Sequence, residues 1–350
     1  MGSFENIFSD VTAALKKDPH ASVHKAGDLS IKSHIPFGIP TGIPELDFNI
    51  GRPGWPAGRC VELYGFEHCG KTTLALHAIA SAQRMGGGAL FIDTEKSWDD
   101  QRAIQVGVDI DNRFLIGDAD SVEGAFRIIQ ATLASRLENN DGTPLVIAVD
   151  SVTGTATEAM KAKTIGEEER MGGDARAIRG GMRRIVPSLA DAKITLIMIN
   201  HAIATMAPNK YAPQSTAAGG HAIKLFSTVR CNLAHKGWLN DKDTGERLGQ
   251  KVGIRIEKLK NSQLAYSEVP EVHLLKETGF STVDNLLDAG IKAGWVAHSE
   301  GSKTYKLGEA SFPKVDWPEI VNDHGGTEKA YQEFLDWCVA EGKISPWSES

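Results

Sequence analysis

The sequence predicts an α/β fold in which helices cover both faces of a mostly parallel central sheet. Strand-like and helix-like segments alternate from about residue 35, which favours a doubly wound core. Three strand-like segments, at 88–95, 143–151 and 194–201, are near-continuous apolar runs, as is typical of parallel strands buried on both faces. The chain has 350 residues, 41% of them hydrophobic, so it can bury a large core and still carry appendages.

Residues 1–35 are predicted to form a helical arm. Apolar residues recur at helical spacing at Phe4, Ile7, Val11 and Leu15, and a polar linker follows. An isolated helix of this length is marginal in water, so it should pack against another surface. A neighbouring subunit and the chain's own core are the two candidates.

The core is predicted to span residues 36–277, and the order of its elements follows from the pattern. The expected strands are 59–65, 88–95, 143–151 and 194–201, and the expected helices are 71–86 and about 97–106. Segments 227–235 and 251–259 alternate more, which indicates edge or antiparallel strands. From residue 278 a short helix at 282–289 and a hairpin at 294–308 predict a small α+β C-terminal domain, 278–350.

The composition excludes several classes of protein. A net charge of −7 argues against a surface that is basic all over, although a local basic strip stays compatible with it. No apolar run approaches the roughly 18 residues of a membrane span, and the N-terminus lacks a signal-peptide core. The four cysteines lie far apart in the sequence, which fits reduced thiols in an intracellular protein.

A phosphate loop connects the first core strand to its helix. The residues that match the pattern, with the threonine that follows, are Gly65, Phe66, Glu67, His68, Cys69, Gly70, Lys71, Thr72 and Thr73. Backbone N–H groups and the helix dipole favour phosphate at such a turn. Lys71 is expected to reach the β and γ phosphates, and the Thr72 hydroxyl to coordinate Mg²⁺. The flanking strand and helix make a chance match unconvincing.

Polar residues at the ends of three other strands are the candidates for metal binding and hydrolysis. An ionised Asp150 at the end of a buried strand would be costly without a cation, so it fits Mg²⁺; capping of the next helix is the alternative. Glu95 is the expected general base, or else a solvated glutamate. Asn200 and His201 are expected to sense the γ-phosphate, or else to be ordinary strand-end residues.

Two segments are expected to bind the second ligand. Residues 157–173 lead into a helix on which Arg176, Arg179 and Arg183 share one face, a pattern that favours phosphate binding over an ordinary solvated face. Gly180 and Gly181 weaken that helix and would let another backbone approach closely. Residues 202–220 form a long loop directly after His201. The loop offers Lys210 and Tyr211 for single strands, and Gly219 and Gly220 for phosphates. This arrangement indicates an ATP-gated polymer binder.

The chain resembles the RecA recombinase family over residues 36–277. The segments that carry the resemblance occur in the family's order and are "PTGIPELD", "LYGFEHCGKTTLAL", "FIDTEKSWD", "GVDIDN", "VIAVDSV", "IMINH" and "AGGHAIKLFSTVR". The resemblance implies a RecA-like ATPase that needs ATP and Mg²⁺, polymerises through its N-terminal arm and forms a helical filament on single-stranded DNA. It also implies pairing and strand exchange with homologous double-stranded DNA in recombination and repair. Mediator and single-strand-binding proteins are suggested partners, in the cytoplasm of a bacterium or of a phage-infected host.

The resemblance also assigns residues. Glu95 matches the catalytic glutamate, Asp150 the magnesium-side aspartate, and Asp99 an adenine-side residue. Residues 161–173 and 202–220 match the two DNA-binding loops. The predicted DNA-binding residues are Lys161, Lys163, Arg170, Met171, Gly172, Arg176, Arg179, Arg183, Lys210, Tyr211, Gly219 and Gly220.

Four features depart from the bacterial pattern. His201 stands where bacterial members usually have Gln, and phage UvsX-like relatives resemble this chain there. The interface lysines that reach a neighbour's ATP are either Lys258 and Lys260, or Lys260 with Ser262 in place of the second. Arg102 stands near the usual adenine-stacking Tyr and could stack as a guanidinium plane. The acidic C-terminal tail is absent.

Two other functions compete with a recombinase. A non-catalytic mediator or regulatory paralogue would bind ATP without exchanging strands, but the intact set of Lys71, Glu95 and Asp150 argues against it. A ring-forming helicase or clock-type ATPase could share the fold, and the long paired loops disfavour it.

Overall fold

The computed structural model describes residues 3–17, 23, 34–139, 141–164, 172–204, 215–219, 221–260 and 267–347. The chain divides into two compact units, Met1–His34 and Ile35–Ser350. The first unit contains α1 (Ser3–Leu15), on which the side chains of Ile7 and Val11 are exposed. The packing of this apolar face against another surface stays a prediction. Within the described residues, no helix is both long enough and apolar enough to span a membrane.

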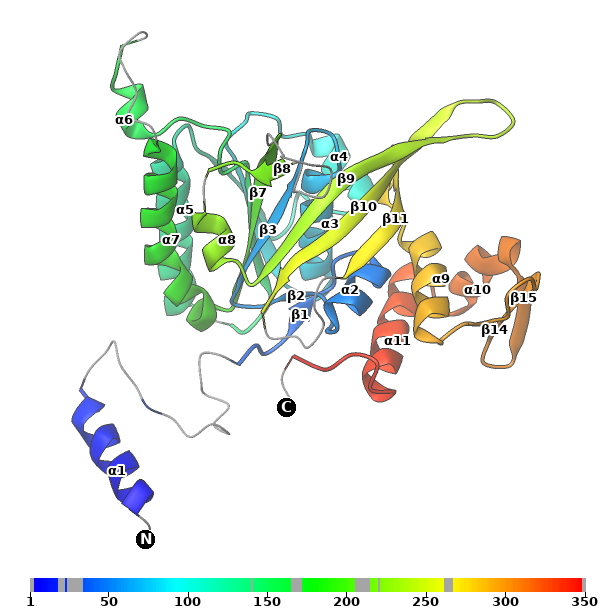
Figure 1. Cartoon of the computed structure of the whole chain (residues 1–350), viewed down its shortest axis with the longest axis horizontal. Coiled ribbons are helices and arrows are strands. Elements are labelled where there is room, and N and C mark those ends of the chain that lie inside the picture. The colour runs from blue at the N-terminus through cyan, green and yellow to red at the C-terminus, as the bar shows by residue number, and fades with distance from the viewer. Residues whose placement is uncertain are drawn as a thin grey trace. The chain divides into compact units, whose positions relative to one another are not determined.

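A large mixed sheet forms the centre of the second unit (Figure 1). Its strand order is β12-β11-β10-β9-β3-β7-β6-β4-β5, and β8 pairs with β7. The parallel part consists of β3 (Cys60–Gly65), β4 (Gly88–Asp93), β5 (Phe114–Asp118), β6 (Leu145–Asp150), β7 (Ile194–Ala204) and β9 (Val229–Asn240). The antiparallel part adds β10 (Arg247–Leu259), β11 (Glu268–Leu275), β12 (Gly279–Phe280) and β8 (Ser215–Ala217). The predicted fold class is therefore confirmed.

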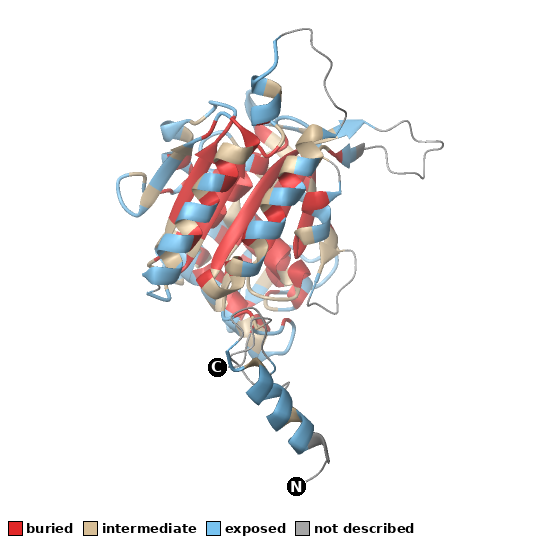
Figure 2. Ribbon diagram, turned by 90° about the vertical axis from the view of Figure 1, so that its left-hand side faces the viewer, coloured by how far each residue is buried: buried red, intermediate tan, exposed pale blue. Residues whose placement is uncertain are grey.

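Helices cover both faces of the parallel strands because each carries one apolar stripe. One core cluster joins the sheet to α3 (Lys71–Arg84) and α4 (Asp100–Val106). The opposite cluster joins it to α5 (Val122–Glu138), α7 (Gly173–Ala192) and α8 (Ala222–Phe226). Figure 2 shows the result, with buried strands behind helices whose outer faces are exposed. Two short pieces complete the core, α6 (Glu158–Lys161) and the pair β1 (Gly38–Ile39) and β2 (Trp55–Pro56).

The C-terminal segment packs around a third apolar cluster that includes Trp317 and Phe334. Its elements are α9 (Thr282–Ala293), β13 (Ala297–His298), β14 (Thr304–Leu307), β15 (Ala310–Pro313), a 3-10 turn (Lys314–Asp316), α10 (Trp317–Asp323) and α11 (Thr327–Ala340). The helix is longer than expected, and the expected hairpin carries a third strand. The segment is tied to the core at α2 (Pro44–Ile50), where the Tyr331 hydroxyl donates to the buried carboxylate of Asp47. Its independence as a domain stays a prediction.

Candidate ATP and DNA site

The phosphate loop lies at the carboxyl end of β3, where α3 begins. Gly70 precedes the helix with φ of 91°, a conformation that glycine adopts without strain. A Cβ at this position would lie 2.8 Å from Leu274 Cδ2 and 2.9 Å from Phe280 Cζ. The backbone turn and the close packing of β11 and β12 therefore both require glycine, and the first turn of α3 is left facing the loop, as phosphate binding needs.

The Lys71 ammonium lies inside this loop. Its Nζ donates to the carbonyl oxygens of Phe66 at 2.8 Å and Gly65 at 3.1 Å, and the side chain is buried. A cation held against the loop backbone complements the N–H groups of the helix start, so both would attract the same anion.

Thr72 and Asp150 form a pair of oxygen ligands beside the loop. The Thr72 hydroxyl donates to Asp150 Oδ2 at 2.5 Å. Burial, opposed by this hydrogen bond, raises the pKa of Asp150 to about 6. A hydroxyl and a carboxylate at such a distance suit Mg²⁺, which prefers oxygen ligands and takes few of them from protein. The predicted metal residues are thus brought together and fit the ion.

Glu95, which lies just after β4, contacts Ser151 just after β6 and His201 in β7. His201 Nε2 lies 2.7 Å from Glu95 Oε1, and the Ser151 hydroxyl donates to the same oxygen. Burial alone would raise the pKa of Glu95, but the hydrogen bonds from Ser151 and His201 outweigh it and lower the pKa. The carboxylate is therefore held ionised and able to accept a proton.

Gly154 makes room for this carboxylate. A Cβ at Gly154 would lie 2.7 Å from Glu95 Cγ, Glu95 Oε1 and Ser151 Oγ. Any side chain would displace the carboxylate or its hydroxyl partner. The sequence reasoning missed this residue, although a glycine four positions after Asp150 in "DSVTG" was a readable signal.

Asp93 shapes the segment that carries Glu95. Its buried carboxylate accepts from the backbone N–H of Glu95 at 3.1 Å and of Trp98 at 3.0 Å. The Trp98 ring packs between Phe91 and Phe114, with centroids 4.8 and 5.1 Å away. The turn after β4 is thus held by Asp93 at its start and by Trp98 at its end, and these contacts fix the position of Glu95.

Asp99 and Arg102 have local partners. The Asp99 carboxylate caps α4 by accepting from the Arg102 N–H at 3.1 Å. The Arg102 guanidinium donates to the carbonyls of Lys276 at 2.6 Å and Leu275 at 3.3 Å, and burial lowers its pKa. Their expected place beside an adenine base stays a prediction.

Lys258 and Lys260 lie away from Glu95 in this chain. The register of β10 on β9 and of β9 on β3 puts them toward the Cys60 end of β3, opposite the phosphate loop. Lys258 Nζ donates to the carbonyls of Lys224 and Leu225 in α8, and burial lowers its pKa to about 8. A single chain does not bring these lysines to its own nucleotide site. Ser262, the alternative partner, is outside the described residues.

Part of the predicted DNA surface forms a groove between α5 and α7. A cavity of about 400 Å³ is lined by Glu123, Phe126, Arg127, Gln130, Glu158, Arg176, Ala177, Gly180, Gly181, Arg184 and Ile185. The ring of Phe126 would lie 2.4 Å from a Cβ at Gly181, whereas a Cβ at Gly180 meets nothing within 4 Å. A close approach to α7 therefore occurs at Gly181, where the neighbour is the Phe126 ring and not a second backbone as expected.

Arginines with different environments surround the groove. Arg176 lines it together with Arg184, which the sequence reasoning had not selected, although it recurs two helical turns after Arg176. Arg179 and Arg183 are exposed on α7 but do not line the cavity. Arg127 is paired with Glu158 at 2.6 Å. Positive charge therefore extends along the start of α7.

The structure describes only some of the other predicted DNA-binding residues. Lys161 pairs with Asp120, and Lys163 lies two residues beyond it. Gly172 and Gly219 have φ of 80° and 71°, and a Cβ at Gly219 would lie 2.7 Å from Thr153 Cγ2. Five predicted residues lie outside the described residues: Arg170, Met171, Lys210, Tyr211 and Gly220.

Comparisons with known proteins identify the family to which the chain is similar. The family model described as the RecA N-terminal domain matches residues 9–281. Protein RecA of Frankia alni is 33% identical over 342 residues, which cover 95% of this chain and 92% of that protein. Protein RecA of Gluconacetobacter polyoxogenes is 36% identical over 261 residues, covering 75% and 71%. Protein RecA of Fusobacterium nucleatum is 36% identical over 290 residues, covering 82% and 72%.

Proposed function

This chain belongs to the RecA family, and from that premise we propose that it is a DNA-dependent ATPase that forms helical filaments on single-stranded DNA. In the filament it pairs homologous double-stranded DNA and exchanges strands, in recombination and repair in the cytoplasm of a bacterium or of a phage-infected host. Mediator and single-strand-binding proteins would assist its loading.

The observation that carries the proposal is the contact between Glu95 and His201. Glu95 Oε1 accepts from Ser151 and lies 2.7 Å from His201 Nε2, and His201 directly precedes the segment 202–220. A group that activates water and a group that leads into a long loop therefore share one hydrogen bond. A change at the γ-phosphate that moves either residue would reach the loop.

The geometry supports a hydrolytic role for each of these residues. Lys71 would hold the β and γ phosphates, while Thr72 and Asp150 would hold Mg²⁺, which neutralises developing phosphate charge when bound. The ionised Glu95 would accept a proton from the attacking water. Gly154 keeps the space into which Glu95 fits.

In a filament, a neighbouring subunit would supply the lysines that a single chain does not bring to its own nucleotide site. Lys258 and Lys260 lie far from their own phosphate loop, so they would serve the nucleotide of a neighbouring subunit. The exposed apolar residues of α1 would pack on that neighbour. DNA would lie along the arginines of α7 and the two loops, so that only the inner surface of the filament needs positive charge despite the net charge of −7.

Strand exchange tests the proposal directly. We expect exchange with ATP, stable filaments without turnover with a slowly hydrolysed analogue, and neither with ADP. ATP turnover should rise when single-stranded DNA is added. The recombinase assignment would be refuted if the rate of ATP turnover were the same with and without DNA and electron microscopy showed no filaments. ATP binding without turnover would indicate a mediator, and rings would indicate a helicase-type assembly.

A further inference from the structure

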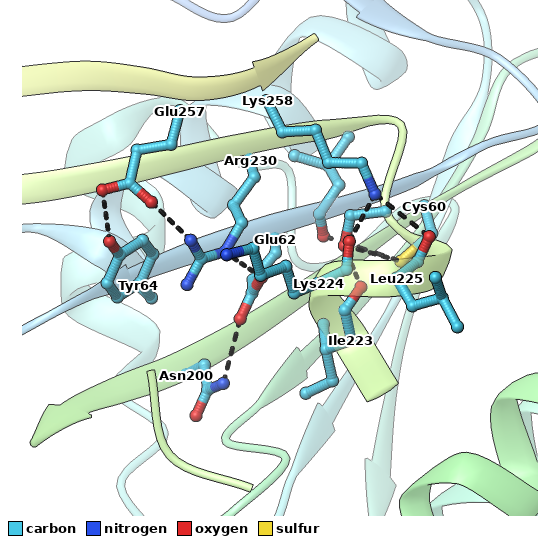
Figure 3. A network of polar contacts seen from close by, with 12 residues as sticks. Cys60, Glu62, Tyr64, Asn200, Ile223, Lys224, Leu225, Arg230, Glu257 and Lys258 are labelled. Carbon is cyan, nitrogen blue, oxygen red and sulfur yellow. Dashed lines mark hydrogen bonds and ion pairs between the residues drawn. The ribbon is translucent and has the colours of Figure 1, made fainter. Parts of the chain in front are cut away.

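A cluster of charged side chains connects β3, β9 and β10, with Glu62 and Arg230 buried and Glu257 partly exposed (Figure 3). Glu62 and Arg230 are 1% and 4% exposed, and Arg230 Nε donates to Glu62 Oε2 at 2.6 Å. Arg230 Nη1 also donates to Glu257, whose other oxygen accepts from the Tyr64 hydroxyl at 2.6 Å. Apolar residues of similar volume often stabilise a core as well as a buried ion cluster does. The cluster therefore calls for a role other than stability.

The cluster is hydrogen-bonded to the side-chain amide of Asn200. Asn200 Nδ2 donates to Glu62 Oε1 and to the Ala218 carbonyl, both at 3.0 Å, while the Thr153 hydroxyl donates to Asn200 Oδ1 at 3.1 Å. The side chain is fully buried. Both amide hydrogens are therefore used, and the amide oxygen has its own donor.

Glu62 fixes which way this amide points. A flipped amide would place its oxygen against Glu62 Oε1 and the Ala218 carbonyl, two acceptors that offer it no proton. Arg230 pairs with the other oxygen of Glu62, and Glu257 holds Arg230 in turn. In Glu62→Gln the new amide could donate to a flipped Asn200 oxygen, which would remove one of the two acceptors that oppose the flip.

Asn200 joins three segments of the proposed site. Thr153 lies two residues after Ser151, which donates to Glu95. His201, which contacts Glu95, is the next residue in β7. Ala218 is hydrogen-bonded through its N–H to the His201 carbonyl at 2.8 Å, near the end of the segment 202–220. The amide thus links both ends of that segment to the hydrolytic residues.

We propose that Glu62, Arg230 and Glu257 are positioning residues, which hold the Asn200 amide so that the end of segment 202–220 stays attached beside Glu95 and His201. The inference rests on the proposed function, because it assigns these residues to the coupling between bound DNA and ATP turnover. They touch neither ligand. Their loss uncouples the two activities while both binding sites remain.

The test compares Glu62→Gln with a matched control. Glu45→Gln also neutralises a buried glutamate that contacts an asparagine and a cation, Asn285 and Lys292, but between α2 and α9. ATP turnover is measured with and without single-stranded DNA, together with the affinity for ATP. In Glu62→Gln the stimulation by DNA should fall about tenfold, while ATP affinity and DNA-free turnover stay near those of the unsubstituted protein. Glu45→Gln should keep full stimulation.

A second variant guards against a folding defect. The triple change Glu62→Leu, Arg230→Met and Glu257→Leu replaces the cluster by apolar side chains of similar volume, which should preserve thermal unfolding. It should lose stimulation to the same extent, and the Ala218 amide should exchange its hydrogen about tenfold faster than in Glu45→Gln. Full stimulation in both folded variants would overturn the inference. An unsubstituted protein that DNA does not stimulate would instead refute the proposed function on which it rests.

Discussion

His201 Nε2 lies 2.7 Å from Glu95 Oε1, although His201 lies in β7, Glu95 lies in the turn after β4, and the two residues are 106 positions apart. The contact brings the carboxylate that we propose as the general base to the strand that leads into segment 202–220. Burial alone would raise the pKa of Glu95, but the hydrogen bond from Ser151 and this contact with His201 together lower it. In the proposed mechanism, ATP hydrolysis and the position of segment 202–220 would both depend on this contact.

Glu95→Gln should stop turnover and spare binding. The amide keeps the shape and can still accept from Ser151, but it cannot take a proton from water. We expect kcat to fall by about 10²- to 10⁴-fold with unchanged affinity for ATP. Steady-state turnover and fluorescent-nucleotide titration measure the two quantities. The exposed Glu309→Gln is the control, and normal turnover in Glu95→Gln would show that another group is the base.

Gly154→Ala should act on the same carboxylate from a distance in sequence. The added Cβ would lie 2.7 Å from Glu95 Oε1 and Cγ, so the carboxylate must move. A misplaced general base should lower kcat by about 100-fold and leave ATP affinity nearly unchanged. Gly180→Ala, where a Cβ meets nothing within 4 Å, should leave DNA-free turnover intact. Equal kcat values in the two variants would contradict the packing argument.

The sequence reasoning recovered the elements whose signals are local. The apolar runs of β4, β6 and β7 identify buried parallel strands, and the phosphate loop identifies its own strand and helix. β5 (Phe114–Asp118) was missed because it is a short edge strand whose Leu115 and Ile116 are exposed, so it carries no alternating pattern. β11 (Glu268–Leu275) was also missed. Its sequence, EVPEVHLL, contains a proline and charged residues, and its pairing with β10 makes it a strand.

The residues of the candidate site likewise fall into those with a local sequence signal and those without one. Lys71, Thr72, Glu95 and Asp150 follow from motifs within single segments. Gly154 and Arg184 matter because residues distant in sequence approach them, Glu95 in one case and the α5 face of the groove in the other. The charged cluster of Glu62, Arg230 and Glu257 joins three strands, and no single segment reveals it.

The adjacent glycines of α7 should respond oppositely to alanine. Gly180 has open space around it, so Gly180→Ala should stabilise the protein by about 1 kcal/mol through helix propensity. At Gly181 the new Cβ would lie 2.4 Å from the Phe126 ring, so Gly181→Ala should destabilise by about 1–3 kcal/mol through overpacking. Urea unfolding measures both changes. Shifts of the same sign would show that α5 and α7 do not meet at Gly181.

Asp47 should make stability depend on pH. Burial raises its pKa from 3.8 to about 7, although hydrogen bonds from Tyr331 and Thr41 oppose the rise. The folded protein therefore holds a proton that the unfolded chain has lost, so the stabilisation is complete below pH 4 and is lost as pH rises through about 7. Relative to Asp47→Asn, the free energy of unfolding should fall by up to about 4 kcal/mol between pH 4 and pH 8. The exposed Asp111→Asn should show no such trend in urea unfolding. A difference that is constant with pH for Asp47→Asn would mean that this carboxyl stays ionised.

Arg176 and Arg184 should contribute to DNA affinity through phosphate contacts. Both line the groove between α5 and α7, and neither has an acidic partner at ion-pair distance among the described residues. Each contact with a phosphate releases condensed counterions, so losing one contact should reduce the slope of log affinity against log salt by about 1. Arg176→Gln and Arg184→Gln should each weaken binding of single-stranded DNA equally for all base compositions.

Fluorescence anisotropy over a series of salt concentrations, with the slowly hydrolysed ATP analogue present, measures that slope. Arg113→Gln is the matched control, because Arg113 lies in the turn before β5, where it donates to the Gly86 carbonyl. An unchanged slope in both groove variants would place the DNA elsewhere on the filament. A loss limited to particular sequences would instead mean that these arginines read bases, which a phosphate contact cannot do.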